Sequence, residues 1–463
     1  MSFTSLHFYL FLVLLLGLLR FISNNKHKKL LLLTASYWFY MSWDWRFGAL
    51  LFAMTAVNFY CGKKIHRSIY AKRWLAVSII FSLGLLGFFK YFNFFLDNLD
   101  VAAAWFGLSS HLGLLQILLP VGISFYTFQA LSYTIDIYKK ELEPVNSLTD
   151  FALFVSFFPQ LVAGPIVRAS YFLPQLTKQS RVDSATQQEA VMLIIKGLIK
   201  KVILADILAI HLVDPAFTNY GSLSSAFLIL ALVGYSFQVY LDFSAYTDIA
   251  RGCALLLGYK LPINFNRPYL AHSISNFWQR WHISMSSFFR DYLYHGVGGS
   301  RYGNVYINLF ITFIAIGFWH GAGWNFLLYG FCHGAVVSIE RFGRQYGWFL
   351  LNTGWLHILA ILRTFFIVCL LRVMFRAESL AEANQYMQAI WHNSHLPFDL
   401  TTVGAVALIS AIILHLIPQR IMASWQQRFV SSSHLLQATS IVLVLFSLII
   451  FGSAEAPFIY FQF

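Results

Sequence analysis

The sequence predicts an all-α integral membrane protein that crosses the bilayer many times, and three observations support this. Of the 463 residues, 58% are hydrophobic and only 11% are charged. Soluble domains contain about 25% charged residues and at most about 50% apolar ones. Apolar stretches run almost from end to end, and basic residues gather in the polar segments between them. This composition excludes a soluble body with a single membrane anchor.

Apolar stretches of membrane-spanning length recur along the chain. A helix that crosses the bilayer needs about 20 predominantly apolar residues. The candidate crossings are residues 6–22, 47–61, 74–96, 114–136, 225–241, 304–319, 324–339, 354–375, 401–418 and 434–452. Further apolar stretches are shorter or interrupted, and we expect them to be re-entrant, tilted or interfacial: residues 30–42, 151–166 and 190–213. About 10–12 crossings follow, in one domain of residues 1–463 without internal repeats.

The net charge of +13 is dispersed between the apolar segments, which argues against nucleic-acid binding. Lys and Arg accumulate in the cytoplasmic loops of membrane proteins, where they meet anionic lipids. We therefore expect two basic clusters, Lys26–Lys29 and Lys63–Arg73, on the cytoplasmic side. Positive charges follow the first apolar run, Leu6–Ile22, and do not precede it. We interpret this run as a retained helix and not as a cleaved signal peptide.

Ionisable residues lie inside the apolar stretch that begins near residue 235. Charged groups at membrane depth usually face a bundle interior or a wet cavity. For Asp242 the alternatives are such a cavity and a helix that ends near this residue at the interface. Asp248 and Arg251 are three residues apart, a spacing at which they form a structural pair on one helix face.

Residues 276–303 are amphipathic, and we expect them to lie against or dip into the protein without spanning the membrane. Trp278 and His282 are four residues apart, so they share a helix face. A histidine in such a segment is either a structural hydrogen-bonding group or a catalyst. The residues alone leave both interpretations open for His282.

A second histidine, His320, follows the apolar segment from Tyr306 to Trp319 and is flanked by Gly321 and Gly323. Glycines loosen a helix and allow another backbone or a substrate to come close. A histidine at membrane depth beside aromatic rings and a helix break is a functional candidate. The alternative is a histidine that binds a backbone carbonyl at a helix end. We expect the later His333 to serve helix packing.

The sequence lacks the residues that several kinds of catalytic site require. No glutamate occurs between Glu189 and Glu340, so no carboxylate pair suits glycosidase chemistry. The sequence has no GxSxG elbow, no HExxH motif, no Cys/His cluster and no Walker A lysine, so we predict no metal, no serine triad and no ATP-driven pump. The four cysteines are far apart and predict no disulfide framework. Histidine remains as a general base, and its pKa suits proton removal at neutral pH.

Four long runs make a specific resemblance visible. They are SFFPQLVAGPIVR (156–168), YSFQVYLDFSAYTDIARGCALLLGYKLPINFNRPYLA (235–271), FWQRWHISMSSFFRDYLY (277–294) and FWHGAGWNFLLYGFCHG (318–334). In sequence and order they resemble the membrane-bound O-acyltransferase family. They are most similar to its bacterial branch, which includes the alginate O-acetylation membrane subunit and the teichoic acid D-alanyl transfer protein. The resemblance covers nearly the whole chain and is strongest between residues 150 and 334.

The resemblance implies a ring of tilted transmembrane helices around a thin centre, where funnels from both sides meet. It implies that His320, in the family's WHG motif, and His282, in its RWH motif, are catalytic. A histidine at position 282, where other branches have asparagine, is typical of the bacterial branch. We further predict substrate contacts for Trp278, Trp319, Asn325 and Asp242.

The implied reaction transfers an acyl group, expected to be acetyl, from a cytoplasmic thioester such as acetyl-CoA. The expected acceptor is a hydroxyl of an extracytoplasmic polysaccharide or of a secreted, esterase-like partner protein. We expect a multi-pass protein of the bacterial inner membrane. The alternatives are transfer of D-alanine or another acyl group to a teichoic-acid-like polymer, and a non-catalytic channel that serves a partner transferase. The long motif match disfavours an ordinary transporter.

Overall fold

A computed structural model describes residues 1–107, 115–178, 182–347 and 354–433, with residues 435–437, 439–440, 442–443, 446 and 458–459. All regular elements in these residues are helices, and no strand occurs among them. The chain divides into two compact units, residues 1–183 with 253–262 and residues 184–252 with 263–463. Each unit is described by itself.

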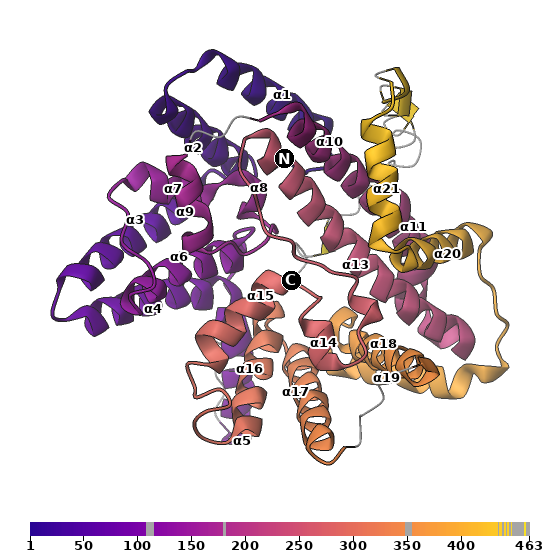
Figure 1. Ribbon diagram of the computed structural model, residues 1–463. Helices are drawn as coiled ribbons and strands as arrows, with labels where there is room; N and C mark the ends of the chain where they lie inside the picture. Colours follow the sequence, from indigo (N-terminus) through magenta and orange to yellow (C-terminus); the bar gives the residue numbers. More distant parts are fainter. Residues whose placement is uncertain are drawn as a thin grey trace. The chain divides into compact units, whose positions relative to one another are not determined.

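The first unit is built from short and medium helices. They are α1 (Leu6–Phe21), α2 (Asn25–Met41), α3 (Arg46–Arg67), α4 (Ala71–Leu86), η1 (Gly87–Tyr91), α5 (Phe92–Trp105), α6 (Ile123–Tyr138), α7 (Leu148–Ser156), α8 (Phe158–Leu161) and α9 (Ala169–Thr177). Helices α3, α4 and α6 pack side by side (Figure 1). Residues 115–122 are not helical, although the predicted crossing begins at residue 114. Pro120 lacks an amide donor and Gly122 is left-handed, with φ 77°, so α6 begins only at Ile123.

The second unit holds most of the buried polar groups. Its helices are α10 (Ser184–Leu198), η2 (Ile199–Ala205), α11 (Asp206–Leu208), η3 (Ala209–Val213), α12 (Asp214–Thr218), η4 (Tyr220–Ser222), α13 (Ser225–Leu256), η5 (Pro268–Leu270), α14 (Ile274–Trp278), α15 (Ile283–Phe288), η6 (Phe289–Tyr294), α16 (Val305–His320), α17 (Trp324–Gln345), α18 (Gly354–Arg376), α19 (Leu380–His392), η7 (Asn393–His395), α20 (Thr402–Leu416) and α21 (Gln419–Val430). Helix α13 runs well past the predicted end at residue 241. Asp242 and Asp248 are therefore inside a helix and buried. The alternative of a helix end near Asp242 was wrong.

Three helical stretches among the described residues are long and apolar enough to cross a membrane: Ala71–Trp105, Ser225–Leu256 and Gly354–Arg376. Helix α20 and the residues Arg420–Val430, bent by 94°, would form a fourth together. Most other predicted crossings fall on helices that are shorter or carry more charge, among them Leu6–Phe21 and Val305–His320. The predicted crossing at 434–452 lies largely outside the described residues.

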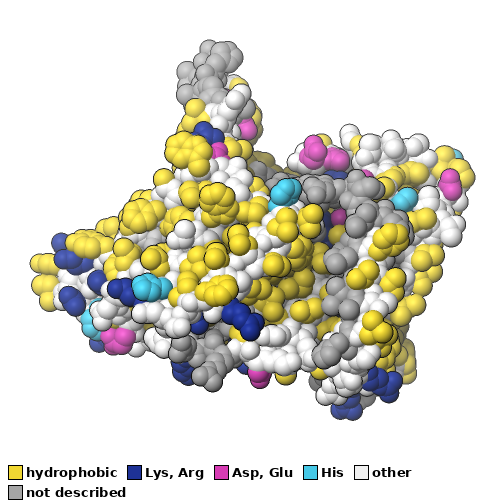
Figure 2. Space-filling model, turned by 90° about the horizontal axis from the view of Figure 1, so that it is seen from above, with side chains coloured by type: hydrophobic (Ala, Val, Ile, Leu, Met, Phe, Trp, Pro, Cys, Tyr) yellow, Lys and Arg dark blue, Asp and Glu magenta, His cyan; other side chains and the backbone are white. Residues whose placement is uncertain are grey.

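Large apolar side chains cover much of the surface. Hydrophobic groups dominate the face in Figure 2. Helix α1, for example, exposes Leu6, Leu10, Val13 and Leu14. Soluble monomers do not expose apolar surface on this scale, because water penalises it. The protein is therefore an all-α, multi-pass membrane protein.

Candidate active site

His320 ends α16, at the tip of the hairpin that α16 forms with α17 (Figure 1). Two glycines bring the backbones of these helices into contact. A Cβ on Gly317 would lie 2.2 Å from the carbonyl oxygen of Phe326, and one on Gly330 would lie 2.3 Å from that of Phe313. Any side chain at either position would force the two helices apart. The close packing of α16 and α17 therefore fixes the position of His320.

The His320 imidazole is buried among aromatic rings, with 4% of the residue exposed. Its ring centroid lies 5.0 Å from that of Trp319, 5.1 Å from Phe375 on α18, and 6.3 Å from Tyr329 on α17. An apolar wall of this kind excludes water from the reacting groups. The prediction that His320 lies at depth beside aromatic residues and a helix break agrees with this environment.

His282 occupies the N-cap of α15 in a left-handed conformation, with φ 43° and ψ 54°. It is fully buried. The loop that carries Asn264 holds this strained backbone, since the Ile283 amide donates to the Asn264 carbonyl oxygen over 2.9 Å. Oδ1 of Asn264 accepts from Ser284 N at 3.0 Å and Ser284 Oγ at 2.9 Å, and it lies 3.4 Å from His282 Nδ1. Asn264, which was not predicted, thus positions His282.

Trp319 lies between the two histidines. The centroid of its ring is 5.7 Å from that of His282 and 5.0 Å from that of His320. Phe243 on α13 contacts the His282 ring from another side, at 4.7 Å. The fold therefore brings together His282, Trp319 and His320, residues that are up to 38 positions apart in the chain. One indole contacts both imidazoles.

Trp278 lies on α14, and Glu340 of α17 holds the start of this helix. The Glu340 carboxylate accepts hydrogen bonds from Ile274 N at 2.7 Å and Ser275 N at 3.2 Å. The Trp278 indole contacts the ring of Phe313 on α16, with 5.6 Å between centroids. Carboxylates stabilise helix N-termini because they satisfy unpaired amides there. The short helix therefore has a fixed position against α17.

A cavity of about 640 Å³, named here the Trp278 cavity, adjoins this segment. Ile283, next to His282, and Ile316, one turn before His320, line it with Trp278. Its polar lining includes Arg290, Arg341, Arg344, Ser286, Ser287 and Gln345. The cavity is thus cationic at its polar wall and apolar near the two histidines.

Asn325, a predicted substrate contact, joins α17 to α18 through hydrogen bonds. Its Nδ2 donates to the carbonyl oxygens of Met374 at 3.2 Å and Ala377 at 2.8 Å. These carbonyls belong to the C-terminal end of α18, which lacks intrahelical partners. Substrate binding by Asn325 stays a prediction, and its amide donors already have protein partners.

Asp242 lies in a buried ion-pair cluster. One carboxylate oxygen is 2.7 Å from Lys201 Nζ, and the other accepts from the Ile459 amide at 2.7 Å. Lys201 is also 2.9 Å from Asp206. The cluster satisfies the buried charges, as burial requires. It gives Asp242 a structural role beside the substrate contact that the sequence predicts.

Arg372 is a buried charge in the apolar helix α18 that the sequence analysis did not select. It is 1% exposed, and its guanidinium carbon lies 4.3 Å from the centroid of Trp281 and 5.2 Å from that of Phe375. Phe375 in turn contacts His320. The sequence did offer a signal for Arg372, because an arginine within a largely apolar helix often marks a functional position in a membrane.

An all-helical membrane fold with histidines, carboxylates and an arginine in its interior defines a polytopic protein with a buried polar centre. The model of MBOAT, the membrane-bound O-acyltransferase family, matches residues 139–371. This chain belongs to that family. It is therefore an acyltransferase, and its reaction requires an acyl donor.

Proteins similar to this chain are named for acyl-transfer reactions. "Probable alginate O-acetylase AlgI" of Pseudomonas aeruginosa is 39% identical over 391 residues, which cover 83% of this chain and 73% of that protein. "Peptidoglycan O-acetyltransferase" of Helicobacter pylori is 39% identical over 398 residues, with 79% and 74% covered. "Teichoic acid D-alanyltransferase" of Bacillus subtilis is 30% identical over 268 residues, with 54% and 66% covered. The resemblance predicted from the four sequence runs is confirmed.

Proposed function

We propose that this protein transfers an acetyl group from acetyl-CoA, delivered from the cytoplasm, to a hydroxyl beyond the bacterial inner membrane. The observation that supports this best is the buried row of His282, Trp319 and His320. The names of the relatives from Pseudomonas aeruginosa and Helicobacter pylori support acetyl as the group. The acceptor is a polysaccharide hydroxyl or a hydroxyl of a secreted, esterase-like partner protein.

In this mechanism His320 accepts the proton of the acceptor hydroxyl. The hydroxyl oxygen then attacks the thioester carbonyl carbon, the C–S bond breaks, and the proton passes to the departing thiolate. General-base catalysis of this kind contributes about 10²–10⁴-fold in rate. His282, positioned by Asn264, orients the donor, and Trp319 contacts both histidines. The aromatic surroundings exclude water, which would otherwise hydrolyse the thioester.

The Trp278 cavity is the proposed entry for the donor. Coenzyme A is a phosphate-rich molecule with a long, neutral arm. The polar wall holds Arg341 and Arg344, and guanidinium groups match phosphates because they form bidentate bonds with phosphate oxygens. Arg290 beside them is already paired with Asp291. Ile283 and Ile316 line the wall nearest to the two histidines, where the thioester would react. Trp278 contacts the arm between these ends.

A second candidate function is the transfer of D-alanine to a teichoic-acid-like polymer from a carrier protein. The Bacillus subtilis relative favours it, at 30% identity and over a smaller share of both chains. A third possibility is a non-catalytic acyl channel in which the histidines only line the path. The channel differs from both enzymes because it leaves the thioester intact when no partner is present.

The test compares wild type with His320→Gln as purified proteins incubated with acetyl-CoA in detergent. The proposal expects slow loss of the thioester with wild type and a loss slower by about 100-fold or more with the variant, the lower bound for a general base. D-alanyl transfer is scored with a D-alanyl carrier protein as donor. Equal thioester loss in both proteins, with and without a secreted partner, removes His320 from the chemistry. Thioester loss that occurs only when the partner is present, and equally in both proteins, favours the channel.

A further inference from the structure

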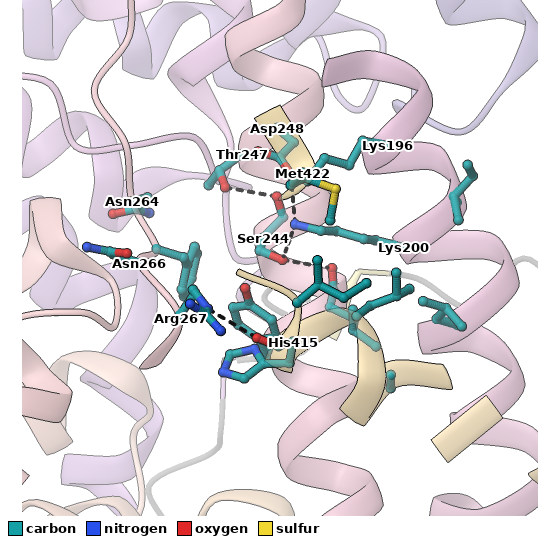
Figure 3. Close-up of a pocket in the computed structure, with 18 of the residues that line it drawn as sticks. Lys196, Lys200, Ser244, Thr247, Asp248, Asn264, Asn266, Arg267, His415 and Met422 are labelled. Atoms are coloured by element: carbon teal, nitrogen blue, oxygen red, sulfur yellow. Dashed lines mark hydrogen bonds and ion pairs between the residues drawn. The ribbon is translucent and has the colours of Figure 1, made fainter. Parts of the chain in front are cut away.

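A second cavity, of about 450 Å³, lies on the side of the His282 loop formed by Asn264, Asn266 and Arg267. We name it the cationic pocket. Lys196 and Lys200 reach it from α10 and η2, Asp248 and Arg251 from α13, and His415 from α20. Figure 3 shows Lys200 extended across the pocket toward Ser244 and Asp248, with Arg267 and His415 at another wall. The proposed mechanism does not use this cavity.

The charges of the pocket favour an anion. Lys200 Nζ lies 2.7 Å from Asp248 Oδ2, Lys196 Nζ lies 3.3 Å from the same oxygen, and Arg251 Nη1 lies 3.8 Å from Oδ1. One carboxylate thus faces three cations. Arg267 adds a fourth cation, and its guanidinium donates to the carbonyl oxygens of His415 and Leu416. The four cations exceed the one carboxylate by three charges, so the pocket retains positive charge that its own residues do not neutralise.

Unsatisfied donors in the same pocket point to the same class of ligand. Asn264 Nδ2, Arg251 Nε and His415 Nδ1 are buried and have no hydrogen-bond partner among the described residues. The Tyr269 amide donates to His415 Nε2 at 3.3 Å, so the neutral ring carries its proton on Nδ1, which is a donor. Asn264 is 1% exposed and His415 is 6% exposed. Buried polar groups usually find partners, and an acceptor-rich ligand such as a phosphate would supply them.

The other walls of the pocket are apolar and lie at a surface of interfacial character. Ile195 and Ile199 line it from α10 and η2, and Met422 and Trp425 line it from α21. Helix α21 is amphipathic and turns by 94° from α20, as a helix does when it leaves the membrane to lie along its surface. A ligand for this pocket therefore combines an anionic head with apolar chains. Basic pockets between transmembrane helices on the cytoplasmic side bind anionic lipid headgroups in this way.

We propose that the cationic pocket binds the phosphodiester headgroup of an anionic membrane phospholipid and that this lipid supports His282 through Asn264. Oδ1 of Asn264 lies 3.4 Å from His282 Nδ1 and accepts from Ser284, while Nδ2 of the same side chain is left for the headgroup. A bound phosphate would fix the Asn264 amide and with it the loop that holds the left-handed backbone of His282. The lipid site is a different cavity from the Trp278 cavity, through which we propose that the acetyl donor enters.

The binding test uses the purified full-length protein in detergent and follows thermal unfolding with added phosphatidylglycerol or phosphatidylcholine. A ligand that binds only the folded state raises the unfolding midpoint as its concentration rises. We expect phosphatidylglycerol to raise the midpoint of wild type by several degrees more than phosphatidylcholine does. Arg251→Gln removes a pocket cation but leaves the Lys200–Asp248 pair, and it should lose most of this difference. Lys196→Gln is the second variant if Arg251→Gln does not fold.

Arg420→Gln is the matched control, because Arg420 lies on α21 but does not line the pocket. This variant should keep the full phosphatidylglycerol effect. Equal effects of the lipid on wild type, Arg251→Gln and Lys196→Gln would overturn the proposal. So would an equal rise in the midpoint with inorganic phosphate alone, which needs no acyl chains.

A donor assay separates the lipid from the acyl donor as the occupant. Arg251→Gln is compared with Arg341→Gln, a variant of the Trp278 cavity. Arg341→Gln should raise the KM for acetyl-CoA and keep the phosphatidylglycerol effect, whereas Arg251→Gln should lose that effect. A tenfold rise in KM for Arg251→Gln with an unchanged lipid effect would assign the pocket to the donor and refute the lipid. Because unfolding reports lipid binding without turnover, failure of the proposed acetyl transfer leaves this test intact.

Discussion

Nε1 of Trp278 donates a hydrogen bond to Nδ1 of His333 over 3.3 Å, and this bond joins α14 to α17. Because Nδ1 is the acceptor, the neutral His333 ring carries its proton on Nε2. Nε2 is buried and has no hydrogen-bond partner among the described residues. The bond also sets the orientation of the indole at the wall of the Trp278 cavity. His333 thus supports a predicted substrate contact from a position for which the sequence predicts helix packing.

The first prediction concerns this bond. His333→Ala leaves the Trp278 donor unsatisfied and should lower the free energy of unfolding by about 1–3 kcal/mol. Trp278→Phe removes the donor, and the double variant should be less destabilised than the sum of the two single ones, since the partners are in contact. Thermal or denaturant unfolding in detergent measures all four proteins. Strict additivity would mean that the bond does not contribute to stability.

The second prediction is that His320→Ala abolishes polymer acylation in cells. The imidazole is buried among aromatic rings beside Trp319, whose indole also contacts His282. Acylation is measured on isolated polymer, and membrane levels of the variant are compared with wild type. His27→Ala, at an exposed position, is the control and should acylate normally. Near-normal acylation by a variant present at normal levels would contradict the role of His320.

A third prediction uses the backbone of His282, which has φ 43°. A non-glycine residue in this conformation costs about 1–2 kcal/mol. His282→Gly should therefore unfold at higher temperature than His282→Ala, although both lack the imidazole and both should lose activity. Unfolding midpoints and thioester turnover are measured on the same samples. If His282→Gly were the less stable of the two, the left-handed conformation would not be a source of strain.

The fourth prediction distinguishes structure from substrate binding at Asp242. Removal of one member of a buried ion pair costs about 3–5 kcal/mol, because it leaves the partner charge uncompensated. Asp242→Leu should therefore destabilise the protein, although Lys201 keeps its pair with Asp206. Lys201→Met should destabilise it more, because Lys201 is the cation that both carboxylates share. A pure substrate contact would instead raise the KM and leave the unfolding midpoint unchanged. Asp44→Asn, in an exposed pair with Arg46, is the control and should change stability little.

The fifth prediction concerns membrane orientation. Lys29 Nζ lies 2.7 Å from Asp150 Oδ1, and Lys63 Nζ donates to the Asn146 carbonyl oxygen at 3.4 Å. Both basic clusters therefore contact the start of α7 or the residues just before it, which agrees with the expectation that they share one side. His27→Cys and Ser68→Cys, each in a background without the four native cysteines, should resist an impermeant thiol reagent on intact cells. Labelling of both from outside would reverse the assigned orientation.

Much of the helical fold follows from the sequence, since apolar stretches predict where helices lie. The predicted segments at 304–319 and 354–375 agree closely with α16, Val305–His320, and α18, Gly354–Arg376. Helix length was predicted less well. Apolar composition does not reveal that polar partners from elsewhere allow α13 to continue through Asp242. It also does not predict the π-helical turns of η2 and η3, which break the stretch at 190–213.

The candidate site was predicted in its residue types but not in its contacts. The histidines and Trp319 stand out because polar and aromatic groups are concentrated around them in an apolar chain. The residues that hold these side chains in place do not stand out, because each pairs with a residue far away in sequence. Asn264 meets His282 from 18 positions away, and Lys201 meets Asp242 from outside any recognisable motif. Such pairs arise from tertiary packing, which local spacing does not encode. No sequence periodicity marks them.

The backbone contact between α16 and α17 also bears on protein engineering. At Gly317 and Gly330 even one methyl group would meet a carbonyl oxygen of the opposite helix. Mutant libraries aimed at new acyl donors should therefore leave this hairpin unchanged and vary the opposite wall of the Trp278 cavity, at Ser286, Ser287 and Ile283. Variants of that wall alter the volume available to the donor without moving the support of His320.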